Sequence, residues 1–254
     1  MLESYIRSRL VEKKILLMTH IVIGYPSLEA SLRIVETMVA AGVDLMELQI
    51  PFSEPIADGP VILKANQQAL ADGVTVKQCL DFGKTVAGRF PIPFLYMTYY
   101  NILFKYGVNR FARHMHTAGL RGAIVPDLPP EEAGQYLDAM GEKQLAPIFI
   151  FSPTTSPARM DTIAKVADGF VYCVARKGVT GDQTNFSQQL DDYLACCRAA
   201  TPLPLALGFG VKDRSDIDFL KGKADIAVVG TQALRIMEAK GIAAVGEFIH
   251  GLQR

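Results

Sequence analysis

The sequence predicts an α/β fold in which eight parallel strands alternate with helices around a closed (β/α)₈ barrel. Eight short apolar runs are spaced along the 254 residues, stretches of helical periodicity separate them, and no linker or low-complexity tract divides the chain. Runs that are apolar almost throughout are typical of parallel strands, which are covered on both faces, and a barrel of this kind needs about 250 residues. We therefore expect residues 1–254 to form a single domain, with an extra helix before the first strand.

The expected strands are the apolar runs 15–23, 43–50, 92–98, 122–126, 145–151, 169–175, 203–209 and 224–230. Among the helical stretches, 28–42 aligns Leu28, Leu32, Val35 and Val39 on one face and ends at Gly42, a natural C-terminal stop.

Two further helices have clear start signals. Residues 156–169 begin with Ser-Pro and residues 129–144 begin with two prolines and two acids, which are typical of a helix N-terminus. The competing fold is a doubly wound open sheet. It would normally carry a G-x-G-x-x-G fingerprint after the first strand, whereas the first run here is followed by Gly24-Tyr25-Pro26-Ser27.

Composition excludes several classes of function. The 26 basic residues balance the 26 acidic ones, which argues against a nucleic-acid binder. No apolar run reaches the 18 or so residues of a membrane span, and the run after Lys13-Lys14 lacks the cleavage site of a signal peptide. The cysteines form no C-x-x-C pair and the histidines no cluster with acids, so we expect no metal site, reduced thiols and a cytoplasmic protein.

If the barrel is right, the chemistry lies where the strands end. Gly208-Phe209-Gly210 follow the seventh run, and Gly230-Thr231 end the eighth and open a helix. Small residues at a helix start expose backbone N–H groups to an anion, although each glycine alone can simply turn the chain. The stretch 175–186 is long, polar and glycine-bearing, as a mobile lid would be.

Two carboxylates lie at the end of the second run. Glu47 is surrounded by Val43, Leu45, Leu48 and Ile50, which disfavours its ionised form as general acid–base catalysis requires. Asp58 lies in a polar loop and is expected to stay ionised, so the two acids can divide their labour. The alternatives are a salt-bridged Glu47 and an Asp58 that forms a turn and caps the helix from Val61.

The segment ELQIPFSEPIADGPVI resembles the signature of the tryptophan synthase alpha chain family, in which Glu47 and Asp58 fall on the two catalytic acids. The resemblance continues in the family's order through 97–107, 125–132, 146–156, 175–181, 207–211 and 228–234.

The resemblance implies a TIM barrel that cleaves indole-3-glycerol phosphate to indole and glyceraldehyde 3-phosphate, without a cofactor. By the same match, Gly181, Phe209, Gly210, Gly230 and Thr231 surround the substrate phosphate. Tyr99 and Tyr172 line the substrate pocket, and Thr180 closes onto Asp58.

The resemblance also implies a partner. The alpha chain docks on a beta chain that carries pyridoxal phosphate, in an α₂β₂ assembly through which indole passes. The contact falls on the loops after strands 2, 3 and 4, here with Pro51, Glu54, Asn101, Asp127 and Pro129. Proline in such loops also serves simple rigidity.

Three positions depart from the family pattern. Gln49 stands where a glycine is usual, Glu54 replaces an aspartate, and His20 replaces a phenylalanine. If Gln49 points into the barrel mouth, it narrows the pocket or adds a hydrogen bond there. We interpret His20 as a neutral, hydrogen-bonded core histidine.

Rival functions stay open. One is a stand-alone lyase that releases free indole, and another is a catalytically weak barrel that mainly activates its beta partner. A barrel lyase or isomerase for another sugar phosphate is a third.

Overall fold

The computed structural model describes residues 1–175, 183–208 and 210–253. These residues build a closed barrel in which β1 to β8 follow one another in chain order, each strand parallel to the next, with β8 returning to β1. The strands are β1 (Leu16–Val22), β2 (Leu45–Gln49), β3 (Phe94–Met97), β4 (Gly122–Ile124), β5 (Ala146–Phe151), β6 (Val171–Val174), β7 (Leu205–Gly208) and β8 (Ile226–Val229). Each expected strand is confirmed, slightly shorter than its apolar run.

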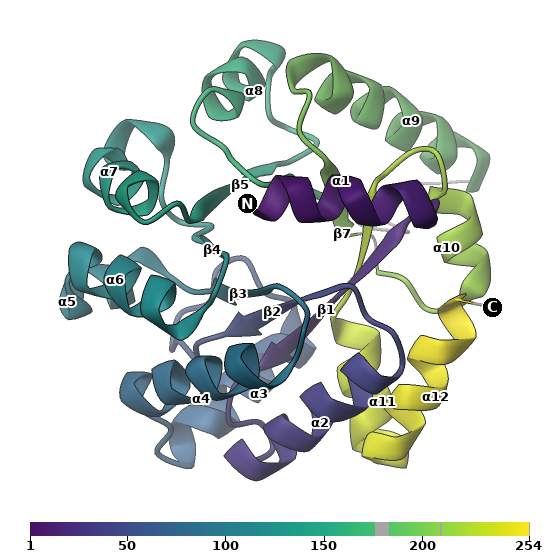
Figure 1. Ribbon diagram of the computed structural model, residues 1–254. Coiled ribbons are helices and arrows are strands. Elements are labelled where there is room, and N and C mark those ends of the chain that lie inside the picture. The colour runs from purple at the N-terminus through teal and green to yellow at the C-terminus, as the bar shows by residue number, and fades with distance from the viewer. Residues whose placement is uncertain (176–182, 209, 254) are drawn as a thin grey trace.

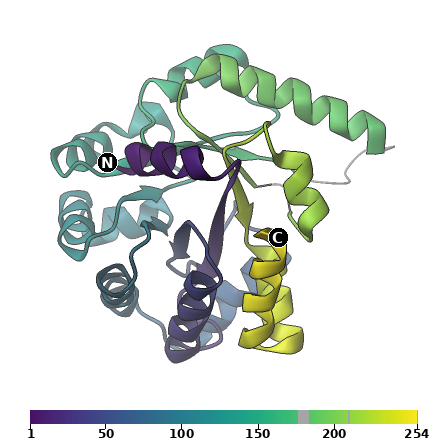
Figure 2. The same cartoon turned by 45° about the vertical axis from the view of Figure 1, so that its right-hand side comes forward.

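Helices surround the strands on the outside, and Figure 1 and the turned view in Figure 2 both show this ring. The α-helices are α1 (Leu2–Glu12), which lies outside this ring, α2 (Leu28–Ala40), α3 (Pro60–Ala71), α4 (Val76–Arg89), α5 (Tyr100–Tyr106), α6 (Val108–Ala118), α7 (Gly134–Glu142), α8 (Pro157–Ala164), α9 (Gln183–Ala200), α10 (Arg214–Leu220), α11 (Thr231–Lys240) and α12 (Ile242–Gln253).

The expected extra helix is α1, which lies across one end of the barrel (Figure 1). Its Leu2 and Ile6 join an apolar cluster inside the barrel that includes Leu16, Leu45 and Phe170. Since these strand residues lie at or before the starts of their strands, α1 covers the N-terminal end. The C-terminal ends of the strands face the other way.

The packed face of α2 is offset from the one that the sequence predicts. Ser31, Ile34, Val35 and Met38 are buried, whereas Leu28, Leu32 and Val39 are half-buried and pack against the core from its edge. Strand and helix positions therefore follow from the apolar pattern more closely than the exact rotation of a helix does.

The single helix expected over 129–144 is wrong. A short 3₁₀ helix (Pro130–Glu132) precedes α7, and the backbone turns at Ala133, whose N–H bonds to the carbonyl of Pro130. Two consecutive prolines supply no N–H groups and Gly134 favours helix weakly, so an α-helix forms only from Gly134. By contrast, the expected start of α8 is confirmed, because Ser156 accepts a hydrogen bond from the N–H of Arg159.

None of the helices in the described ranges is both long and apolar enough to cross a membrane.

Candidate active site

Glu47 and Gln49 project into the barrel at the C-terminal end of β2. They are two residues apart, so their side chains share one face of the strand, and both are buried. Nearer the N-terminal ends of β1 and β2, the interior positions are apolar: Met18 on β1 and Leu45 on β2 belong to the same apolar cluster as Leu2 and Ile6 of α1. The barrel interior is therefore apolar at the end that α1 covers and polar at the end where β2 stops.

The register partner of Glu47 on the neighbouring strand β1 is His20. Nδ1 of His20 lies 3.2 Å from Oε1 of Glu47, and both side chains are almost completely buried. Burial alone would lower the pKa of His20, but Glu47, with a further contribution from Asp58, outweighs burial and raises it. His20 is therefore a buried, hydrogen-bonded core histidine as expected, and the carboxylate beside it favours the imidazolium form over the neutral form that the sequence suggested.

Asp58 follows β2 in a turn, where its N–H bonds to the carbonyl of Pro55. Its carboxylate does not cap α3, whose N-cap is Gly59 and which has no side-chain cap. Instead, Oδ2 accepts a 2.6 Å hydrogen bond from Nε2 of Gln49. Burial raises the pKa of Asp58 above its usual value, while the charge of His20 and the bond from Gln49 act to lower it. Asp58 thus lies in a less polar setting than its loop sequence suggests.

Two tyrosines complete the ring of polar groups. The hydroxyl of Tyr99 donates to Oδ2 of Asp58 over 3.4 Å and accepts from the N–H of Ala57. Tyr172 lies on β6, and burial, followed by the charges of Glu47 and Asp58, holds the pKa of its phenol well above its usual value. Both phenols are therefore neutral donors beside the two carboxylates.

The expected anion site lies where β8 leads into α11. The helix begins at Thr231 and Gly230 precedes it without a side-chain cap, which leaves the first backbone N–H groups of α11 available. Gly210 has a φ of +81°, a conformation that favours glycine. The other residues expected near the phosphate and in the lid, Thr180, Gly181 and Phe209, lie outside the described residues.

The residues expected to contact a partner lie on adjacent loops. Pro51 is buried two residues after the end of β2, Glu54 and Pro129 are exposed, and Asn101 is exposed in the first turn of α5. The carboxylate of Asp127 accepts hydrogen bonds of 2.9 and 3.1 Å from the N–H of Tyr100. Asp127 therefore ties the loop after β4 to the start of α5.

The comparisons with known proteins agree with this geometry. The family model described as tryptophan synthase alpha chain matches residues 7–247. The chain is 66% identical over 253 residues to the tryptophan synthase alpha chain of Syntrophotalea carbinolica, with all of both chains covered. It belongs to the tryptophan synthase alpha chain family.

Other relatives support this membership. The alpha chain of Desulforapulum autotrophicum is 63% identical, with 99% of this chain and 100% of that protein covered. The crystal structure of tryptophan synthase subunit alpha from Legionella pneumophila superposes with a TM-score of 0.90 at 30% identity, covering 99% of this chain and 96% of that one. A structure of tryptophan synthase from M. tuberculosis gives a TM-score of 0.91 at 29% identity, covering 99% and 97%. Membership assigns the chain to the lyases of tryptophan biosynthesis.

For a chain of this family, the structure adds one residue that the sequence did not single out. Phe52 stacks on Tyr99, with ring centroids 4.9 Å apart and planes 21° from parallel. Its signal in the sequence is weak, because a single aromatic residue between Pro51 and Ser53 is also typical of an ordinary loop.

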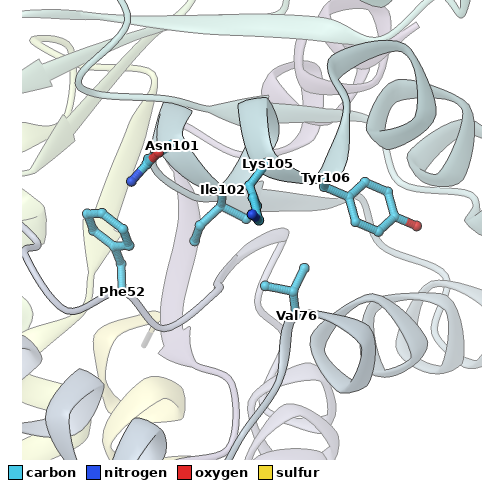
Figure 3. A pocket seen from close by; sticks show the side chains of 6 residues that line it. All are labelled: Phe52, Val76, Asn101, Ile102, Lys105 and Tyr106. Atoms are coloured by element: carbon cyan, nitrogen blue, oxygen red, sulfur yellow. The ribbon is translucent and has the colours of Figure 1, made fainter.

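A cavity of about 380 Å³ lies beside this ring, away from Glu47. Figure 3 shows Phe52 and Val76 facing side chains of α5 across it. It is lined by Phe52, Val76, Asn101, Ile102, Lys105 and Tyr106. The cavity therefore adjoins the expected partner surface rather than the carboxylates.

Proposed function

We propose that the chain cleaves indole-3-glycerol phosphate to indole and glyceraldehyde 3-phosphate by a retro-aldol reaction that needs no cofactor in this chain. The observation that carries the proposal is the pair of carboxylates, Glu47 and Asp58, at the C-terminal end of β2 in a member of this family. Each has a different partner, His20 for Glu47 and Gln49 for Asp58, so their environments suit different roles.

The reaction moves two protons. The indole ring gains a proton at C3, which makes the adjacent carbon–carbon bond breakable, and the side-chain hydroxyl loses one as the aldehyde forms. Glu47 gives the first proton and receives the second. Asp58 accepts the indole N–H and stabilises the positive charge on the protonated ring.

Binding of the remainder of the substrate keeps the reacting carbon in place. We propose that Gly210, Gly230 and Thr231, together with Gly181 and Phe209, hold the phosphate. Tyr99 and Tyr172 line the indole pocket, and Thr180 closes onto Asp58.

We also propose that the chain works in the cytoplasm with a tryptophan synthase beta chain, which carries the pyridoxal phosphate, as an α₂β₂ assembly. The proposed contact residues are Pro51, Glu54, Asn101, Asp127 and Pro129. Two large apolar side chains, Ile56 and Phe104, are exposed in the same region, as a docking surface requires. Light scattering of the mixed chains should give the mass of four subunits, and Phe104→Asp should reduce it to that of the separate components.

The cleavage is tested by indole release from indole-3-glycerol phosphate. Glu47→Gln and Asp58→Asn should each lower kcat by about 10²- to 10⁴-fold, the usual loss for a general acid–base group. Glu29→Gln, an exposed carboxylate in the first turn of α2, is the matched control and should retain full activity. Cleavage that survives Glu47→Gln would refute the assignment.

The beta chain separates the rival functions. Slow cleavage that the beta chain stimulates fits the proposal, whereas fast cleavage without stimulation identifies a stand-alone lyase. If neither the unaltered chain nor Glu47→Gln cleaves indole-3-glycerol phosphate but both stimulate the beta chain, the chain is an activator of its partner.

A further inference from the structure

His20 has a defined place in the polar end of the barrel. It shares the inward face of β1 with Leu16 and Met18, which belong to the apolar inner cluster. A built Cβ at Gly230 would meet its Cβ at 3.4 Å and its Cδ2 at 3.9 Å. The imidazole ring therefore lies between Glu47 on β2 and the start of α11.

The hydrogen-bonding needs of Gln49 and Glu47 favour one protonation state of the ring. Nε2 of Gln49 donates to Asp58, so its Oε1 points elsewhere. That oxygen and Nε2 of His20 are both buried, and neither has a hydrogen-bond partner among the described residues, while the side chain of Gln49 acts to raise the pKa of His20. An amide oxygen only accepts, so a proton on Nε2 suits Gln49, and a proton on Nδ1 suits Glu47.

The charges around His20 favour this doubly protonated ring. Glu47 on β2 and Asp58 in the following loop are acids, and both raise the pKa of His20. Tyr172 on β6 and Tyr99 at the start of α5 are neutral, since burial raises the pKa of each phenol. Gly230 and Thr231, which open α11, carry no charge. These surroundings therefore favour one cation, His20, between two carboxylates.

We propose that His20 is a positioning residue that stores, on Nδ1, the proton that Glu47 delivers to C3 of the indole ring. The inference rests on the proposed function. The proton passes from Nδ1 to Oε1 of Glu47 and from there to C3, leaving a neutral imidazole. When the carbon–carbon bond breaks, the hydroxyl proton returns to Glu47 and then to Nδ1. The cycle consumes no proton and restores the pair.

The first test is the pH profile of kcat for His20→Phe and His20→Asn. In the unaltered chain, the decrease of kcat at alkaline pH (the alkaline limb of the profile) should be centred above the usual histidine pKa of about 6.5. His20→Phe should lower kcat by about 10- to 100-fold, less than the ~10²–10⁴ of a lost acid–base group, with KM unchanged. Its alkaline limb should move to lower pH, because a carboxyl group alone then holds the proton.

His20→Asn separates proton storage from simple orientation. Asparagine can place a donor near the position of Nδ1 but has no titratable proton, so kcat should partly recover while the limb stays displaced. A full return of the parental profile in His20→Asn would overturn the proposal, as would an unchanged profile in His20→Phe. His250→Asn, at an exposed position in α12, is the matched control.

Stability gives a readout independent of activity. The pKa of His20 is raised in the folded chain. The stabilisation from its ion pair with Glu47 is therefore fully present at pH values below the pKa of His20 in the unfolded chain, and it is lost as pH rises through the pKa of His20 in the folded chain. The difference in unfolding free energy between the parent and His20→Phe should therefore fall as pH rises above about 6.5. A pH-independent difference would overturn the proposal. The parent and Glu47→Gln could both fail to release indole while the unfolding free-energy difference still depends on pH. That result would refute the proposed function but still support an ion pair between His20 and Glu47.

Discussion

Asp58 shows how single residues adjust the site. Burial raises the pKa of its carboxyl group, and the hydrogen bond from Gln49 opposes that rise. The sequence placed Asp58 in the loop after the second strand correctly. It raised a hydrogen bond from Gln49 only on the condition that this side chain points into the barrel mouth, and the structure shows that bond, to Asp58.

Gln49→Ala should move the acid limb of kcat/KM to higher pH. The lost bond is one that lowers the pKa of Asp58, and Asp58 must be ionised to accept the indole N–H. Losing this hydrogen bond should cost about 1.4 kcal/mol, near the lower limit for a hydrogen bond to a charged group. That free energy corresponds to a decrease of about 10-fold in kcat/KM. Steady-state rates from pH 4 to 8 measure it.

Gln68→Ala is the matched control, since Gln68 on α3 donates to the exposed Asp72, which follows that helix. It should leave the profile unchanged. An acid limb that stays in place in Gln49→Ala would show that the bond does not affect the protonation of Asp58.

At the scale of elements, apolar runs and turn signals predicted most of the architecture. Every strand was predicted because a strand covered on both faces must be apolar throughout, and that property is local. The interruption at Ala133 was missed although its causes, the two prolines and Gly134, are local. The offset face of α2 was missed because it depends on neighbours that are distant in sequence. The close approach of α4 to β3 is another such feature.

Gly83 on α4 is the point of that approach. A Cβ added there would lie 2.0 Å from the hydroxyl of Tyr96 on β3. Gly83→Ala should therefore lower the free energy of unfolding by about 1–3 kcal/mol, the usual cost of overpacking. Denaturant unfolding measures it.

Gly88 on the same helix provides the comparison. No atom lies within 4 Å of its added Cβ, so Gly88→Ala should stabilise the chain by up to about 1 kcal/mol through helix propensity. Equal effects of the two substitutions would contradict the role of the close approach.

For the whole molecule, the two ends of the barrel have separate tasks. Leu2 and Ile6 of α1 seal the N-terminal end with apolar contacts, whereas His20, Glu47 and Gln49 lie toward the other end. Sequence reasoning assigned chemistry to the strand ends from the general behaviour of such barrels. It could not predict the His20–Glu47 pair, which depends on how β1 and β2 align.

Ile6→Ala should lower the free energy of unfolding by about 2–5 kcal/mol, as expected for a fully buried isoleucine, and leave kcat unchanged. Val11→Ala, at an exposed position of the same helix, should change stability by less than about 0.5 kcal/mol. Thermal unfolding and indole release measure the two effects. A loss of kcat in folded Ile6→Ala would contradict the separation of tasks.

That residues 1–254 form one domain stays a prediction, which a single cooperative unfolding transition in the parent would support.

The seal made by α1 has a consequence for molecular traffic. Among the described residues, packed side chains fill the barrel interior next to α1, so for the proposed cleavage the substrate should enter and both products should leave at the end where β2 stops. Under the same proposal, a protein docked over that end should decide where indole goes: without it, indole should escape to solvent, and with it, indole should pass to the partner.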